Sequence, residues 1–112
     1  MGSHKKMSES VSRETLEKAK LNQETSKIAW SELQRYFAQG VVLCVDDSLD
    51  LIEVSYQVSV DNKSAVEAWV EQGVLGAVSD EQAQSWFADD RDLWAVVVRP
   101  WVLVQERVQE RF

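Results

Sequence analysis

Residues 93–104 read LWAVVVRPWVLV, a nearly unbroken apolar run that holds two of the chain's five tryptophans and its single proline. Both faces of Leu93–Val98 are apolar, which is typical of a strand that is covered on two sides and is therefore central in its sheet. Pro100 has no N–H to donate to a ladder, so strand pairing should break or bulge there. Because proline at the second central position of a tight turn requires a cis bond, we expect one bent strand, or two collinear strands, ending near Gln105.

The first residues, MGSHKK, have the character of an expression leader, and we expect a single natural domain over residues 7–112. Excluding the leader removes His4, the chain's one histidine, and with it the side chain that titrates near neutral pH. Cys44, the one cysteine, lies in the apolar run VVLCV, where burial suppresses the thiolate. The sequence therefore predicts no catalytic residue and no cofactor.

The net charge of the chain is -7, and it is more negative still without Lys5 and Lys6 of the leader. A surface of this sign repels phosphate backbones and anionic lipid headgroups, so neither nucleic acid nor a membrane is an expected partner. The sequence contains no uncharged apolar run long enough to span a bilayer, and no signal peptide follows Met7. We therefore expect a cytoplasmic protein.

Two helices are expected in the first part of the chain. Strong helix formers over Ser12–Lys27 predict the first, whose sparse apolar residues suit packing along one edge of the domain or partial mobility. Ser31–Gln39 predicts the second, with Ser31 as its N-cap and Gly40 as its C-terminal stop. The short link around Trp30 implies a helical hairpin or a sharp bend.

Two β-branched segments follow, Val41–Val45 and Leu51–Val60, separated by the turn-rich residues DDSLD. The second segment alternates between apolar and polar residues, which is typical of a strand with one face on the core and one in water. Their spacing predicts an antiparallel hairpin.

The next segments carry clear helix signals. Asp61 or Asn62 can cap a helix that runs through Gln72, and Val74–Val78 fits either a loop or a brief strand. Ser79 completes a capping box at the start of a further helix. The buried stripe of that helix is expected to consist of Ala83, Trp86 and Phe87.

These elements together predict a single α+β domain. Its sheet is small and mostly antiparallel, made of the hairpin and the long C-terminal strand, and about four helices pack on one face of it. After Gln105, the repeated VQER fits a helical tail and a fraying strand equally well.

Two acidic turns are candidate cation sites, because hard divalent ions prefer carboxylate oxygens. Neither turn has the glycine and distal glutamate of a calcium-binding helix-loop-helix, and aspartate is common in solvated turns. The alternative to an interaction protein is thus a small divalent-cation-binding protein or metal-dependent hydrolase. Its ligands would come from Asp46, Asp47 and Asp50, or from Asp89, Asp90 and Asp92.

The step Arg99-Pro100-Trp101 is the candidate interaction site. In a continuous strand Trp94 and Trp101 lie on opposite faces, and Trp101 is either core or a surface anchor beside the broken ladder. Arg99 would add a directional, charged donor. The leading functional hypothesis is a non-enzymatic protein-interaction or self-association module that binds a protein partner or a second copy.

Three separated strings resemble a small bacterial family, domain of unknown function 2288 (DUF2288). They are IAWSELQRYFAQGVVL, VSDEQAQSWF and LWAVVVRPWVLVQ, and the likeness covers most of Ile28–Gln105. The resemblance implies a bacterial, cytoplasmic origin. It brings no established activity and no catalytic residues to carry over.

Overall fold

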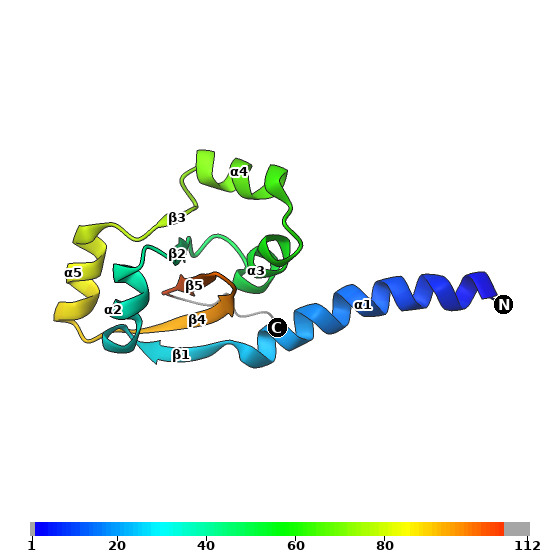
Figure 1. Ribbon diagram of the computed structural model, residues 1–112, viewed down its shortest axis with the longest axis horizontal. Coiled ribbons are helices and arrows are strands. Elements are labelled where there is room, and N and C mark those ends of the chain that lie inside the picture. The colour runs from blue at the N-terminus through cyan, green and yellow to red at the C-terminus, as the bar shows by residue number, and fades with distance from the viewer. Residues whose placement is uncertain (1, 107–112) are drawn as a thin grey trace.

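The computed structural model describes residues 2–106, so the tail from residue 107 onward lies outside the described residues. The elements are arranged as in Figure 1. In chain order they are α1 (Gly2–Glu24), β1 (Ser26–Ala29), α2 (Trp30–Ala38), β2 (Val42–Val45), α3 (Leu51–Ser59), α4 (Lys63–Glu71), β3 (Leu75–Ala77), α5 (Asp80–Ala88), β4 (Asp92–Val98) and β5 (Trp101–Gln105).

The strands form one mixed, mostly antiparallel sheet in the order β1-β4-β5-β2-β3. Strands β4 and β5 pair antiparallel with each other, and β2 lies parallel to β5 on its other side. The short strands β1 and β3 pair antiparallel with β4 and β2 and form the two edges. The predicted α+β class is therefore confirmed.

The apolar run 93–104 forms a tight hairpin, so the expectation of one bent or two collinear strands is wrong. The Arg99–Pro100 peptide bond is cis, and Val98 pairs directly with Trp101 across the turn. Residues directly opposite in an antiparallel pair share a face of the sheet. The hairpin therefore places Trp101 on the same face as Val98 and Trp94 rather than on the opposite one.

Helices cover both faces of the sheet, which corrects the expectation of one covered face. Successive side chains of a strand point to opposite faces, and nearly all those of β4 and β5 are apolar. On one face, the buried residues of the α2–α5 core are Trp30, Leu33, Val42, Val78, Ala83, Trp86, Leu93, Ala95, Val102 and Val104. On the other, those of the α3 core are Leu21, Val45, Leu51, Val54, Leu75, Val96, Val98 and Leu103.

The segment predicted as the second strand of a hairpin is the helix α3. Leu51, Val54 and Ser55 are buried together at helical spacing, whereas a strand would have placed Leu51 on its polar face. The Asp50 carboxylate accepts a hydrogen bond of 3.0 Å from the Ile52 N–H and caps the first turn. Apolar alternation was compatible with both periods, and burial of Leu51 against the sheet favours the helix.

The strand β2 pairs instead with β3, so that of the loop and the brief strand considered for Val74–Val78, the structure has the strand. The segment before Trp30 is the strand β1 and not a simple bend. Ala29, with extended backbone, precedes α2, so Ser31 is not its N-cap; the Trp30 N–H instead donates to the Arg91 carbonyl at 2.8 Å.

The other helix signals behave largely as expected. The Asn62 side chain accepts from Ala65 N–H at 3.3 Å, and the Ser79 hydroxyl accepts from Gln82 N–H at 3.1 Å. Gly40, at φ 76°, follows α2, where the left-handed region suits glycine. The prediction for Phe87 is wrong, because that side chain is 62% exposed.

The helix α1 gives the molecule its length of 58 Å and extends away from the sheet in Figure 1. Its C-terminal part is tied to the domain through buried Leu21 and through Lys18, whose Nζ lies 3.0 Å from a Glu53 carboxylate oxygen. This contact agrees with the predicted packing at the edge of the domain. Among residues 2–106, no helix has the length and apolarity needed to cross a bilayer.

Two neighbouring valines of β4 provide a test of the sheet. Val96 is 1% exposed in the α3 core, whereas Val97, expected to be buried, is 56% exposed near the hairpin turn. Val96→Ala should lower the free energy of unfolding by roughly 1 to 3 kcal/mol, because it removes buried methyl groups and leaves a cavity. Val97→Ala is the matched control and should change it by less than about 0.5 kcal/mol. Equal effects in urea denaturation would contradict this burial pattern.

Candidate functional site

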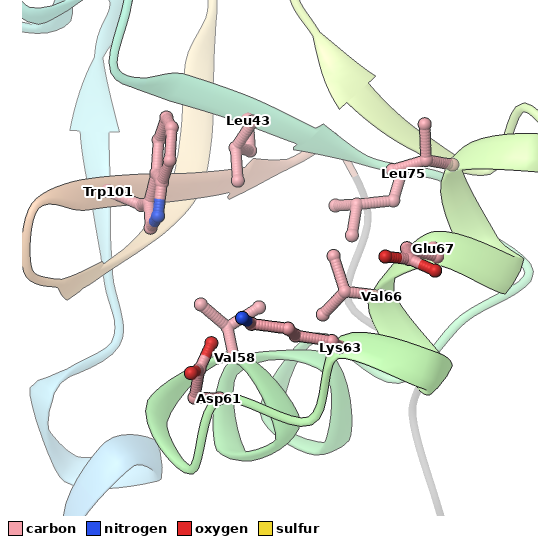
Figure 2. Close-up of a pocket in the computed structure, with 9 residues that line it drawn as sticks. Leu43, Val58, Asp61, Lys63, Val66, Glu67, Leu75 and Trp101 are labelled. Carbon is pink, nitrogen blue, oxygen red and sulfur yellow. The ribbon is translucent and has the colours of Figure 1, made fainter.

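An apolar pocket of about 370 Å³ lies between the sheet and the helices α3 and α4. Figure 2 shows side chains from β2, β5, α3 and α4 converging on it. Its lining consists of Leu43, Val58, Asp61, Lys63, Val66, Glu67, Val70, Leu75 and Trp101. A concave, mostly apolar hollow with a few polar groups is typical of a binding site.

The connection between α3 and α4 shapes the open side of this pocket. Asp61 has a φ of 55°, in the left-handed region that aspartate tolerates better than most residues, and this turns the chain sharply after α3. Asn62 then caps α4, so that Lys63 begins the helix at the rim. In Figure 2 the side chains of Asp61 and Lys63 lie at the same side of the pocket as Val58.

At its other end α4 leads back to the sheet. Gly73, at φ 75°, ends the helix, and the Val74 N–H donates to the Trp69 carbonyl at 3.0 Å. This closing turn positions Leu75, which is 3% exposed, at the start of β3 and against the pocket. The pocket is thus built by two helix ends and a strand pair, not by one contiguous motif.

Trp101 forms the wall of the pocket on the sheet side. It is half-buried, it packs against the α3 core, and Figure 2 shows its ring descending from β5 with the indole nitrogen toward α3 and α4. Its neighbours Arg99 and Pro100 are exposed in the hairpin turn. Of the three predicted interaction residues, the structure therefore brings Trp101 to the pocket and leaves the other two on the turn.

The prediction of a broken ladder with unpaired backbone groups at Pro100 is wrong, because the β4–β5 register continues up to Val98 and Trp101. The sheet edges are β1 and β3 instead. What remains at this position is a large, half-exposed ring beside a hollow.

Sequence reasoning missed the helical side of the pocket. The segment that holds Val58 was predicted to be a strand. Val70 is 52% exposed, and α4 has no buried residue. No local signal marked this surface, because the tertiary fold decides whether the apolar residues of a helix are covered. An apolar surface that the domain leaves partly uncovered is a feature of interaction sites.

The first acidic turn is held in place by the sheet. Gln105 is fully buried, and its Nε2 donates to the carbonyls of Asp46 at 2.9 Å and Leu49 at 2.8 Å. The Asp46 carboxylate accepts hydrogen bonds from the Ser48 hydroxyl and from the Ser48 N–H, the latter at 2.9 Å, and both lower the pKa of Asp46. Asp50 is engaged as the cap of α3.

The second acidic turn spreads over the junction of α5 and β4. Asp89 is the C-cap of α5, Asp90 has a φ of 48°, and Asp92 begins β4. All of them are exposed, as are Asp46 and Asp47 of the first turn. Among the side chains that the structure describes, those of residues 13–106, no three of the types Asp, Glu, Cys and His are grouped so that they could hold a metal ion.

Cys44 does not have the character of a nucleophile. It lies on β2 and packs against the α2–α5 core, and this burial raises the pKa of its thiol to about 11. A hydrogen bond with Gln82 acts in the opposite direction but is the smaller effect. At neutral pH the thiol is therefore protonated.

Comparisons with known proteins agree with the fold and do not name an activity. A family model described as "Protein of unknown function (DUF2288)" matches residues 16–106. The chain is similar to the solution NMR structure of PA1075 from Pseudomonas aeruginosa, with 45% identity and a TM-score of 0.72, over 84% of this chain and 87% of that one. No curated protein matches the chain.

The acidic turns generate a prediction about metals. Calorimetric titration with Ca²⁺, Mg²⁺ and Mn²⁺ should detect no binding tighter than about millimolar, the range of weak carboxylate sites. A micromolar site that disappears when Asp46, Asp47 and Asp50, or Asp89, Asp90 and Asp92, are replaced by Asn would contradict this. Such a site would support the divalent-cation alternative.

The raised pKa of Cys44 predicts low thiol reactivity. With a pKa of about 11 in the folded protein, about one thiol in a thousand is ionised at pH 8, so a disulfide reagent should react slowly. Unfolding in urea returns the pKa to its ordinary value and should accelerate the reaction strongly. Because the folded state favours the protonated thiol, the corresponding stability should be lost as the pH rises through 9 toward 11. Fast reaction of the folded protein would contradict the assignment.

Proposed function

The chain belongs to the DUF2288 family, and from that premise we propose that it serves as a non-enzymatic protein-interaction module. The observation that carries the proposal is the half-exposed Trp101 in the wall of an apolar pocket. Tryptophan is enriched among the residues that dominate binding energy, particularly where it borders a pocket that a partner can fill.

The rim of the pocket supports a protein ligand over a purely apolar small molecule. Asp61, Lys63 and Glu67 place charges of both signs around an apolar interior. A polar rim around an apolar centre is the usual composition of a protein interface. An apolar side chain inserted by the partner would fill the centre, and polar groups beside it would meet the rim.

The helix α4 extends this surface beyond the pocket. Val70 lines the hollow while remaining 52% exposed, so a partner that covers α4 would bury it. Each square ångström of apolar surface removed from water contributes about 25 cal/mol to binding. A catalytic role has weaker support, because His4 is the single histidine of the sequence and the thiol of the single cysteine, Cys44, is protonated at neutral pH.

The decisive experiment compares two valines of equal exposure. Val70 lines the pocket and Val60 does not, although each is 52% exposed. Tagged parent, Val60→Gln and Val70→Gln chains are used in pull-downs from a Pseudomonas aeruginosa lysate, with the mass of each purified chain measured by light scattering. A partner should be retained by the parent and by Val60→Gln and weakened by Val70→Gln, by about tenfold or more.

The double change of Arg99→Ala with Trp101→Ala tests the sheet side of the same pocket. It should remove the same partner, or lower the mass if the partner is a second copy. Because Trp101 packs on the α3 core, the melting temperature of the double variant must be measured as well. If both the double variant and Val70→Gln remain folded and keep every partner, the pocket is not the interaction site.

A further inference from the structure

On the opposite face of the sheet, α2 and α5 lie side by side and enclose a groove of about 430 Å³. The pocket beside Trp101 lies on the other side of the sheet, so the two hollows are separate. The groove is lined by Trp30, Gln34, Phe37, Asp80, Ala83, Gln84 and Phe87.

The floor of the groove is rigid and aromatic. Trp30 is 1% exposed and meets Trp86 edge-on, with ring centroids 5.1 Å apart, and Phe37, at 5.5 Å. Trp86 is in turn fixed by a hydrogen bond of 2.9 Å from its Nε1 to a carboxylate oxygen of Glu106. A preformed floor of this kind loses little entropy when a ligand binds.

Phe87 stands at the border of this groove and is 62% exposed. Phe87 is exposed although Trp86, directly before it, and Ala83, one turn earlier, are buried. The exposed ring and the aromatic floor form one apolar strip between two helices. Such a strip accommodates a third helix, whose apolar face lies in the groove.

The charged residues around the groove indicate which sign of charge the bound helix should carry. Asp80 is the charged residue among those that line it, and the exposed carboxylate of Glu81 follows it in the first turn of α5. Among the described residues of α2 and α5, the basic side chain is Arg35, and its guanidinium is engaged by Tyr36, 3.0 Å from the hydroxyl and 4.9 Å from the ring centroid. Electrostatic complementarity therefore favours a cationic ligand and opposes a second copy of this acidic chain.

We propose that the groove between α2 and α5 binds a cationic amphipathic helix of a partner protein, with Phe87 and the Trp30 floor taking its apolar face. The groove is independent of the pocket beside Trp101. A chain with both sites would join two partner segments on opposite faces of its sheet.

The probe for this proposal is a fluorescein-labelled peptide of leucine and lysine with its leucines at helical spacing. Binding to the full chain is followed by fluorescence anisotropy, and a leucine–glutamate peptide serves as the opposite-charge control. The lysine peptide should bind, should bind more weakly as salt is added, and should exceed the glutamate peptide in affinity by at least about tenfold.

Variants locate the site. Phe87→Ala should weaken binding of the lysine peptide by at least about tenfold. The control Leu16→Ala removes a similarly exposed apolar side chain from α1 and should leave the affinity within about twofold of the parent's. The pair Asp80→Asn with Glu81→Gln should reduce the salt dependence. The pair Glu17→Gln with Glu24→Gln, exposed on α1, is its control.

Amide chemical shifts of the labelled protein separate the two proposals. Shift changes on peptide addition should concentrate on α2 and α5. Changes at Trp101 and α4, changes spread over the acidic surface, equal affinity for both peptides, or retained affinity in Phe87→Ala would each overturn the groove assignment. The pocket beside Trp101 is tested separately, through the partner that Val70→Gln weakens. Of the outcomes above, shift changes at Trp101 would support that pocket as a binding site, and the others do not affect it. A parent dimer that Phe87→Ala dissociates would make the occupant a second copy and equally overturn the proposal.

Discussion

The antiparallel pairing of β4 with β5 is the interaction on which the rest of the structure depends. This hairpin occupies the interior of the sheet, and β1 and β2 add to its two sides. Because its side chains are apolar on both faces, one hairpin supplies the floor of two cores. Each helix layer is then stabilised by burial against strands that are already paired, and neither layer needs a core of its own.

The end of β5 also fixes the loops around the hairpin. The buried amide of Gln105 holds two carbonyls of the turn before α3, and Glu106 accepts from Trp86 and lies 3.5 Å from the Arg91 guanidinium. A buried polar group that loses its partner is costly, so these contacts define the loop positions strongly. In the two aspartate turns, Asp50 caps α3, whereas the other aspartates are exposed: Asp46, Asp47, Asp89, Asp90 and Asp92.

Much of the local structure could be predicted from residues close in sequence. The caps at Asn62 and Ser79, the helix stops, and the brief strand at Leu75–Ala77 depend on side-chain hydrogen bonds and backbone preferences within a few residues. The candidate site was partly predictable, because Trp101 is a large aromatic residue that directly follows the chain's single proline. Its pocket was not, since Val58 and Val70 approach Trp101 only through contacts far apart along the chain.

The α+β class, the apolar strand run and the position of most helices could be predicted from the sequence, because periodicity and capping act locally. The helix at 51–59, the tight hairpin at Pro100 and the coverage of both sheet faces depend on contacts far apart along the chain. For residues 51–59 and for the chain at Pro100, two local conformations were compatible with the sequence, and long-range burial selected between them. Leu51 finds its place in the α3 core only as part of a helix, and Trp101 reaches the pocket only when the chain reverses at Pro100.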